Sequence, residues 1–304
     1  MFFNTHFQVN VNNSTLEIAS RDFANFGFEG SRIFEKIMSD NFNSETRHTD
    51  FTQTDIAAQM INTFTSDHTG GKIQNFVTPD IFKTNAQFLI LNTINLNSNW
   101  KLPFRADRIR NRDFSTATEI IVQNDRFYVI IILPDDVTGL DTIVEDMAVQ
   151  DILDIMNLMD ADASQLVDAY IPQLNIKEDV SMTDTLSRLQ LNSLFNNGAS
   201  LCGISMNGTY VADVSHRAEL VIDGNGINLA AATLATESKK DVYSACPVSS
   251  YPLFGNRLAA SKNVIQALPE LTVFNANHPF LAFVIDGNSK LPLFSARVLD
   301  PSQS

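Results

Sequence analysis

Three stretches of this chain are apolar at nearly every position, a pattern typical of β-strands that are buried on both faces. They are residues 88–91, 128–133 and 280–285. The sequence Asp-Gly-Asn-Ser at 286–289 follows the third stretch and precedes another strand-like segment at 291–298, so it predicts a hairpin turn. These segments predict strands in the interior of the fold.

The remaining periodicity is mainly helical in the first third of the chain and mostly strand-like from residue 209 onward. The apolar residues at helical spacing in the first third are Phe23, Phe26, Phe28, Ile33, Phe34, Ile37, Ile56, Met60, Ile61 and Phe64. Residues 140–158 and 182–191 also have helical spacing, whereas 167–176 suits an edge or bulged strand because Pro172 lies inside it. We therefore predict an α+β fold and treat 1–304 as a single domain.

The composition excludes several classes of function. The 304 residues are 44% hydrophobic and 18% charged, as in a globular protein, and carry a net charge of −14. This charge argues against nucleic acid and anionic membranes as partners. Cys202 and Cys246 are too few for a disulfide framework; two free thiols are the simpler interpretation, and a single bridge between them is the alternative. The N-terminus has no signal-peptide pattern, which predicts a cytoplasmic protein as given, or an extracellular one if the N-terminus is incomplete.

The candidate catalytic and binding residues do not form known motifs. Asp213, Ser215 and His216 are close in sequence, but adjacent residues of a strand point to opposite faces, and no Gly-x-Ser-x-Gly elbow surrounds the serine. The Thr-Gly-Gly-Lys sequence at 69–72 lacks the spacing of a phosphate loop and fits a helix end and turn. The histidines lack metal-ligand spacing. We therefore expect neither an enzyme nor a cofactor or metal.

Ordered motifs over most of the chain give a positive identification. Asn277-His278-Pro279-Phe280 followed by Phe294-Ser295-Ala296-Arg297-Val298 and Pro301 resembles the closing signature of the serpins, a family of serine-protease inhibitors. Ala296 stands where that signature usually has glycine. Further segments resemble serpin motifs in the family's order: 61–73, 92–104, 171–176, 194–205 and 211–218. The chain is thus similar to a serpin from about Thr15 to Pro301.

The resemblance implies a serpin fold with mixed β-sheets, N-terminal helices and an exposed reactive loop at about 224–270. A target serine protease cuts this loop, and the cut loop enters the central sheet as a new strand. The implied hinge consists of Gly224, Asn225, Gly226, Ile227, Asn228, Leu229, Ala230, Ala231, Ala232 and Thr233. Ile227 and Leu229 are larger than the small residues that insertion requires. Residues 234–269 lack steady periodicity, as a functional or disordered segment would.

The position of the scissile bond differs with the direction of counting. Counting forward from the hinge by the family's spacing gives Lys240–Asp241, which suits a trypsin-like protease with an acidic specificity pocket. Counting back from Asn277 gives a position near Ile265, so the loop is about 25 residues longer than usual in the family. Arg257 and Lys262 are basic alternatives inside the loop.

Two segments of the family pattern are missing. The long helical region before Thr15 has no counterpart, and between Glu119 and Arg126 the chain skips strands of the second and third sheets. Loss of these strands removes core partners and exposes sheet edges. We expect a monomer that acts as bait for a serine protease, with reduced or absent inhibition and poor folding as consequences of the missing parts. The alternative is a non-inhibitory serpin-like binding protein or an inactive truncated product.

Overall fold

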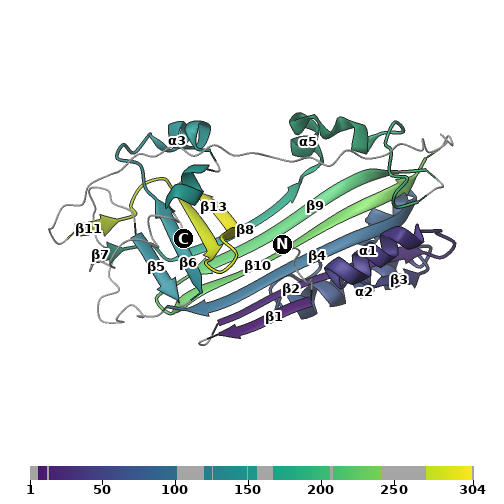
Figure 1. The fold of residues 1–304 in the computed structure, drawn as a ribbon, viewed down its shortest axis with the longest axis horizontal. Coiled ribbons are helices and arrows are strands. Elements are labelled where there is room, and N and C mark those ends of the chain that lie inside the picture. The colour runs from purple at the N-terminus through teal and green to yellow at the C-terminus, as the bar shows by residue number, and fades with distance from the viewer. Residues whose placement is uncertain are drawn as a thin grey trace.

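A long seven-stranded sheet runs through the molecule in the computed structural model (Figure 1), which describes residues 6–11, 14–100, 120–124, 126–148, 150–155, 167–205, 208–240 and 272–302. Its strand order is β1-β2-β4-β10-β9-β8, and β3 pairs with β2 at one end. The bounds are β1 His6–Val11, β2 Ser14–Asn25, β3 Thr46–Thr49, β4 Ala86–Asn99, β8 Leu174–Ser181, β9 Thr209–Ile222 and β10 Gly226–Lys239.

The sheet is mixed, because β2 and β3 are parallel whereas the other pairs are antiparallel. Strands β4, β10 and β9 each have 14 residues and form its centre. β10 pairs with β4 from Gly226↔Asn99 to Ser238↔Ala86, and with β9 from Ile227↔Ile222 to Lys239↔Thr209. β10 therefore has backbone partners on both sides along almost its full length, whereas β9 pairs with β8 only from Ser215 to Ile222.

A four-stranded antiparallel sheet packs at one end of the long sheet. Its order is β13-β12-β6-β5, with β5 Ile120–Asn124, β6 Phe127–Ile132, β12 Phe280–Asp286 and β13 Leu291–Val298. The buried Arg126 guanidinium donates to both carboxylate oxygens of Asp286, at 2.7 and 2.8 Å, and thereby joins the β5–β6 connection to the β12–β13 turn. Two short strands, β7 Val167–Tyr170 and β11 Thr272–Asn275, form a separate parallel pair.

Helices occupy the periphery of the sheets (Figure 1). The α-helices are α1 Arg32–Phe42, α2 Thr54–His68, α3 Leu140–Asp146 and α5 Thr183–Leu186, and shorter helical turns are η1 Pro79–Thr84, η3 Ser187–Leu191 and η4 Asn192–Phe195. Helix α2 ends at Thr69, and Gly70 and Gly71 adopt positive φ angles of 61° and 76°. This confirms that the Thr-Gly-Gly-Lys sequence is a helix end and not a phosphate loop.

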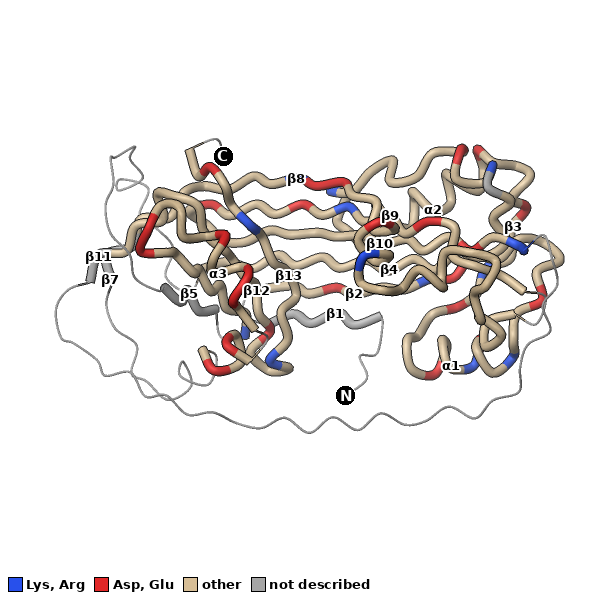
Figure 2. The backbone as a smooth tube through the Cα atoms, turned by 90° about the horizontal axis from the view of Figure 1, so that it is seen from above, with Lys and Arg blue, Asp and Glu red and all other residues tan. Residues whose placement is uncertain are grey.

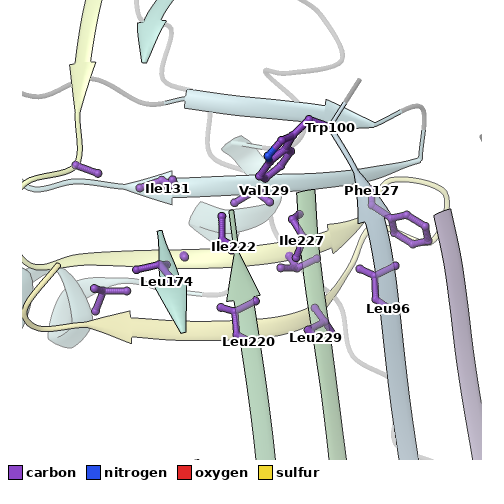
Figure 3. Packing of buried hydrophobic residues seen from close by; sticks show 14 of the residues in the cluster. Leu96, Trp100, Phe127, Val129, Ile131, Leu174, Leu220, Ile222, Ile227 and Leu229 are labelled. Atoms are coloured by element: carbon purple, nitrogen blue, oxygen red, sulfur yellow. The ribbon is translucent and has the colours of Figure 1, made fainter. Parts of the chain in front are cut away.

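Two apolar clusters bury opposite faces of the long sheet. In the first, Leu96, Leu220 and Leu229 of the long sheet pack in one cluster with Trp100 and with Val129 and Ile131 of the four-stranded sheet (Figure 3). In the second, α2 and the chain after it pack on the other face of the sheet. The helix side includes Ala58, Ile61, Phe64, Ile73 and Phe76, and the sheet side includes Leu89, Leu91, Ala230, Ala232 and Leu234. The long sheet is therefore a buried layer between two sets of elements.

Several expectations from the sequence are confirmed by these elements. The apolar runs at 88–91, 128–133 and 280–285 lie in β4, β6 and β12, and the turn at 286–289 joins β12 to β13. Burial on both faces explains why these runs lack alternation. The α+β fold with mixed sheets is confirmed as well.

Other expectations are wrong. Ser14–Asn25, which includes Phe23, is a strand and not part of a helix, because β4 offers it a hydrogen-bonded neighbour over 11 residue pairs. The run at 167–176 is interrupted at Pro172 and forms two strands in different sheets, β7 and β8. Cys202 is disulfide-bonded and not a free thiol, and Cys246 lies outside the described residues.

Charged residues are spread along the described part of the molecule (Figure 2). Lys and Arg are scattered among the more numerous Asp and Glu, as the net charge of −14 requires. Among the described residues, no helix is both long and apolar enough to cross a membrane. Over the same residues, His, Cys, Asp and Glu do not gather in groups of three or more that could hold a metal ion.

Candidate functional site: the central strand β10

The hinge predicted from the sequence lies almost entirely inside the long sheet. Gly224 and Asn225 are in the turn after β9, and the eight residues from Gly226 to Thr233 form the first part of β10. The segment is thus an inserted strand in this structure, whereas the resemblance implies an exposed loop before protease attack. The stretch 234–239, which lacks periodicity in sequence, continues the same strand.

The turn that reverses the chain into β10 is held by Asp223 and Trp100. The Asp223 carboxylate accepts hydrogen bonds from the backbone N–H groups of Asn225 and Gly226, at 2.7 and 3.0 Å. The indole N–H of Trp100 donates to the Asp223 carbonyl at 2.7 Å, and the Trp100 backbone N–H donates to the Asn225 carbonyl at 2.9 Å. The end of β4 therefore fixes where β10 begins.

Gly226 is required at the first position of β10 by its distance from β4. A Cβ atom at this position would lie 2.1 Å from the Ser98 carbonyl oxygen and 2.8 Å from the Asn99 Cα. Both are backbone atoms, which cannot move aside as a flexible side chain can. Glycine therefore permits the close approach of β10 to β4 at the entry to the sheet.

Ile227 and Leu229 fit the sheet interior, so the objection to their size is wrong. Their side chains are 3% and 0% exposed and pack in the first apolar cluster (Figure 3). Leu229 lies in register with Leu96 of β4 and Leu220 of β9. The core between the two sheets accepts large apolar side chains here because the neighbouring strands supply matching ones.

The alanines of β10 face helix α2 or the opposite side in alternation. Ala230, Ala232 and Leu234 are at most 1% exposed and pack in the second apolar cluster, with Ile61 and Phe64 of α2. Small side chains at two of these three positions let the strand lie close beneath the helix. The alanine-rich composition is thus explained by packing on this face.

A line of polar side chains crosses the opposite face at Thr233. Nδ1 of His216 in β9 lies 2.8 Å from the Thr233 hydroxyl. In register with Thr233 on the other side is Asn92 of β4, whose side-chain oxygen accepts a hydrogen bond from Ser20 of β2. Burial lowers the pKa of His216, which favours the neutral imidazole. Insertion of β10 thus gives a half-buried histidine a hydrogen-bond partner.

Two buried carboxyl groups occupy the far end of the same face. Glu237 of β10 is 2% exposed and accepts a hydrogen bond from the Thr209 hydroxyl at 3.3 Å. Asp22 of β2 is 0% exposed, and the Ser44 hydroxyl lies near its carboxylate. Burial raises the pKa of Glu237 to about 8, and the negative charge of Asp22 adds to the effect. Burial also raises the pKa of Asp22 to about 6, and the Ser44 hydroxyl offsets only part of the rise.

Lys240, the candidate residue before the scissile bond, immediately follows β10. Its side chain is 6% exposed, and its ammonium group donates to the Ala199 carbonyl. The backbone N–H of Lys240 donates to the Gly208 carbonyl at 3.2 Å. Asp241 and the alternatives Arg257, Lys262 and Ile265 lie outside the described residues.

The apparent Asp-Ser-His triad does not form a catalytic site. The Ser215 hydroxyl donates to the Asp213 carboxylate at 2.5 Å, and Asp213 also accepts from Thr183 at 3.0 Å. His216 contacts Thr233 instead. The expectation that Ser215 and His216 point to opposite faces is confirmed.

Sequence reasoning missed the residues that surround the hinge. Trp100 lies in the motif at 92–104, but its role in holding the turn depends on Asp223, which is 123 positions away. Asp22 and Glu237 carry no local signal that they share a face. Register places them there: Asp22 pairs with Ile90 and Glu237 with Phe88, two positions apart on β4.

These features define a class of protein in which a hinge segment supplies the central strand of a sheet. The chain belongs to the serpin family. The family model described as "Serpin (serine protease inhibitor)" matches residues 3–125 and 116–301. The match is to a family of inhibitors and not to a family of enzymes.

Individual relatives agree with this assignment. The chain is 24% identical over 303 residues to an antitrypsin of Bombyx mori, which covers 90% of this chain and 71% of the relative. Among solved structures, the cleaved serpin 42Da has a TM-score of 0.74 at 19% identity and covers 93% of this chain and 74% of that one. A loop-inserted, cleaved ovalbumin mutant has a TM-score of 0.72 at 17% identity, with coverage of 94% and 74%.

Proposed function

We propose that the chain is an inhibitor of serine proteases and that β10, with Lys240 at its end, is the bait segment after insertion. The observation that carries this proposal is the match between β10 and its two neighbours. All 14 of its residues are in the sheet, and its two faces are occupied by side chains that fit separate apolar clusters.

The order of events follows from the inserted strand. A protease must first hold the bait in an extended form outside the sheet, because Lys240 is 6% exposed when β10 is inserted. Insertion then adds two full sets of inter-strand hydrogen bonds and buries Ile227, Leu229 and Leu234. The free energy released is available to displace a protease joined to the cut end.

The location of the candidate bond supports a protease that accepts a basic residue. Lys240 follows directly on the last strand residue, so cleavage after it frees the whole of β10 to enter the sheet. A lysine before the cut suits an acidic specificity pocket, as in trypsin-like proteases. Arg257 and Lys262 are alternatives for the same chemistry.

Incubation with a trypsin-like protease tests the proposal. We expect an SDS-stable complex of inhibitor and protease, and we expect Lys240→Ala to reduce its yield at least ~10-fold, since the lysine contributes most of the specificity energy. Lys239→Ala is the matched control, because this adjacent lysine side chain is exposed. Arg257→Ala and Lys262→Ala test the other bonds. Cleavage without any stable complex would contradict inhibition.

One observation favours the alternative of a non-inhibitory serpin-like protein. A hollow of about 380 Å³ lies behind the middle of β10, between Ile94, Ala231, Thr233 and Phe294. Because this hollow is open to solvent, the middle of β10 is only partly covered there, and insertion removes less apolar surface from water. Melting curves before and after cleavage of the loop distinguish the alternatives: an inhibitor gains stability on cleavage, and a binding protein does not.

A further inference from the structure

We propose that Asp22 and Glu237 form a proton-dependent lock on strand β10: the strand remains in the sheet when the two carboxyl groups share no more than one negative charge, and leaves it more readily when both are ionised. This inference rests on the proposed function in one respect, that β10 can occupy a position outside the sheet.

The geometry places the two groups on one face of the sheet. Asp22, Ile90 and Ala235 lie opposite one another across β2, β4 and β10, and Ala24, Phe88 and Glu237 do so one step further along. Residues that lie directly opposite in a sheet share a face, as do residues two apart in one strand. Only β4 separates the two carboxyl groups, and both are almost completely buried.

On β3, Thr46 lies opposite Asp22, and His48 lies opposite Ala24 with an exposed side chain. From β4, the facing side chain is Phe88, whose ring stacks on Phe28 and meets Phe34 of α1 edge-on. From β9, the Thr209 hydroxyl is the group that donates to Glu237. The side chains that contact the pair are thus aromatic rings and the hydroxyls of Thr209 and Ser44, an environment that disfavours two negative charges.

Charged groups on the neighbouring elements bind elsewhere. Lys240 donates to Ala199, and Arg217 to Asp179. His216 contacts Thr233, Lys36 of α1 pairs with Asp40, and Lys177 pairs with Glu219. Asp213 accepts from Ser215 and Thr183. On α1, Arg32 is exposed, and Glu35 lies beside Gly30.

The direction of the effect follows from proton binding. The pKa of Glu237 is about 8 in the sheet, against an ordinary value of 4.5 when the strand is out in solvent. The inserted state therefore binds a proton that the expelled state releases between pH 4.5 and 8. Insertion is fully favoured below pH 4.5, loses stability as the pH rises, and stops losing it above about pH 8.

The test compares melting temperatures of the wild type and Glu237→Gln at pH 5 and pH 8. The glutamine has the same size and no charge, so we expect only a small difference in melting temperature at pH 5, where Glu237 in the sheet is protonated. At pH 8 we expect the variant to melt about 4 °C higher. Glu178→Gln, an exposed glutamate of the same sheet, is the control and should follow the wild type. A difference between wild type and Glu237→Gln that does not change with pH overturns the lock.

Asp22→Asn tests the partnership of the two groups. Without the negative charge of Asp22, ionisation of Glu237 should cost less. The melting temperature of Asp22→Asn should therefore depend less on pH than that of the wild type. An unchanged dependence removes Asp22 from the proposal.

If calcium raises the wild-type melting temperature at pH 8 and leaves Glu237→Gln unaffected, the pair holds a cation and not a proton, and the lock is overturned.

Limited proteolysis separates failure of the lock from failure of the proposed function. We expect cleavage within residues 226–240 to be faster at pH 8 than at pH 6 in the wild type, relative to a control substrate, and equal in Glu237→Gln. Resistance of this segment in both proteins at both pH values means that β10 never leaves the sheet, which contradicts the proposed function itself. Cleavage at rates that do not depend on Glu237 contradicts the lock alone.

Discussion

The two ends of β10 differ in the polarity of the side chains that they bury in the sheet. From Gly226 to Leu234 the strand is mainly apolar: Ile227 and Leu229 pack in one apolar cluster, and Ala230, Ala232 and Leu234 pack in the other. From Ala235 to Lys239 it buries the Thr236 hydroxyl, which has no partner in the described part of the chain, and the Glu237 carboxyl; Lys240, just after the strand, is also buried.

The difference shows where insertion gains free energy and where it loses it. Apolar burial at the entry stabilises the inserted state by about 25 cal/mol for each Å² removed from water. Polar groups buried at the far end oppose it, because each unpartnered donor or acceptor costs roughly 1–3 kcal/mol. We therefore expect β10 to be held most firmly at its first residues, where apolar side chains are buried, and to leave the sheet most easily at its last residues, where polar groups are buried.

Leu229→Ala should have the largest effect on this difference, because it removes the best-packed side chain of the entry. Leu229 is 0% exposed between Leu96 and Leu220. We expect the free energy of unfolding to fall by about 3 kcal/mol, measured by chemical denaturation. Leu189→Ala, at a residue that is 66% exposed, should change it by less than about 0.5 kcal/mol. Equal effects of the two variants would show that the entry is not the anchor.

Gly226→Ala should destabilise the first part of β10 through a steric clash, with a somewhat smaller loss of stability than Leu229→Ala. The added methyl group would meet the Ser98 carbonyl at 2.1 Å, so β10 must move away from β4. We expect a loss of about 2 kcal/mol in the melting analysis. Gly203→Ala is the matched control, since a Cβ there meets no atom within 4 Å. A harmless Gly226→Ala would mean that the strand does not approach β4 so closely.

Thr236→Val should stabilise the far end of β10, with the smallest effect of the three substitutions. The valine has nearly the same shape and removes a buried hydroxyl that has no partner in the described part of the chain. We expect a gain of about 1 kcal/mol in unfolding free energy. Thr93→Val, in which the lost hydroxyl donates to the Ala19 carbonyl at 3.2 Å, should instead cost about 1 kcal/mol. Destabilisation by both variants would refute the polar penalty at Thr236.

Much of the fold is predictable from short-range patterns. The apolar runs in β4, β6 and β12 need cover on both faces, and that requirement is visible in the residues themselves. The hairpin between β12 and β13 is equally local, because its turn residues lie beside the strands that they connect. The strand at Ser14–Asn25 was not predictable in this way, since its phenylalanine spacing also suits a helix and only β4 decides the outcome.

The segment predicted to be the hinge coincides with the first part of β10, but its conformation could not be read from its residues. Three consecutive alanines in β10 have no periodicity that separates a strand from a helix. The edges of β4 and β9, each 14 residues long, give this segment backbone partners on both sides, and that arrangement makes it a strand. Tertiary pairing thus overrides the weak local preference.

By itself the sequence determined which segments must be buried and which family they belong to, because apolar runs and turn residues act over a few neighbouring positions. Only the tertiary structure decided that β10 lies inside the sheet, that Ile227 and Leu229 fit there, and that Asp22 and Glu237 share one face. The physical reason is that strand register joins residues far apart in the chain. The cost of a buried charge depends on those distant neighbours and not on the residues beside it.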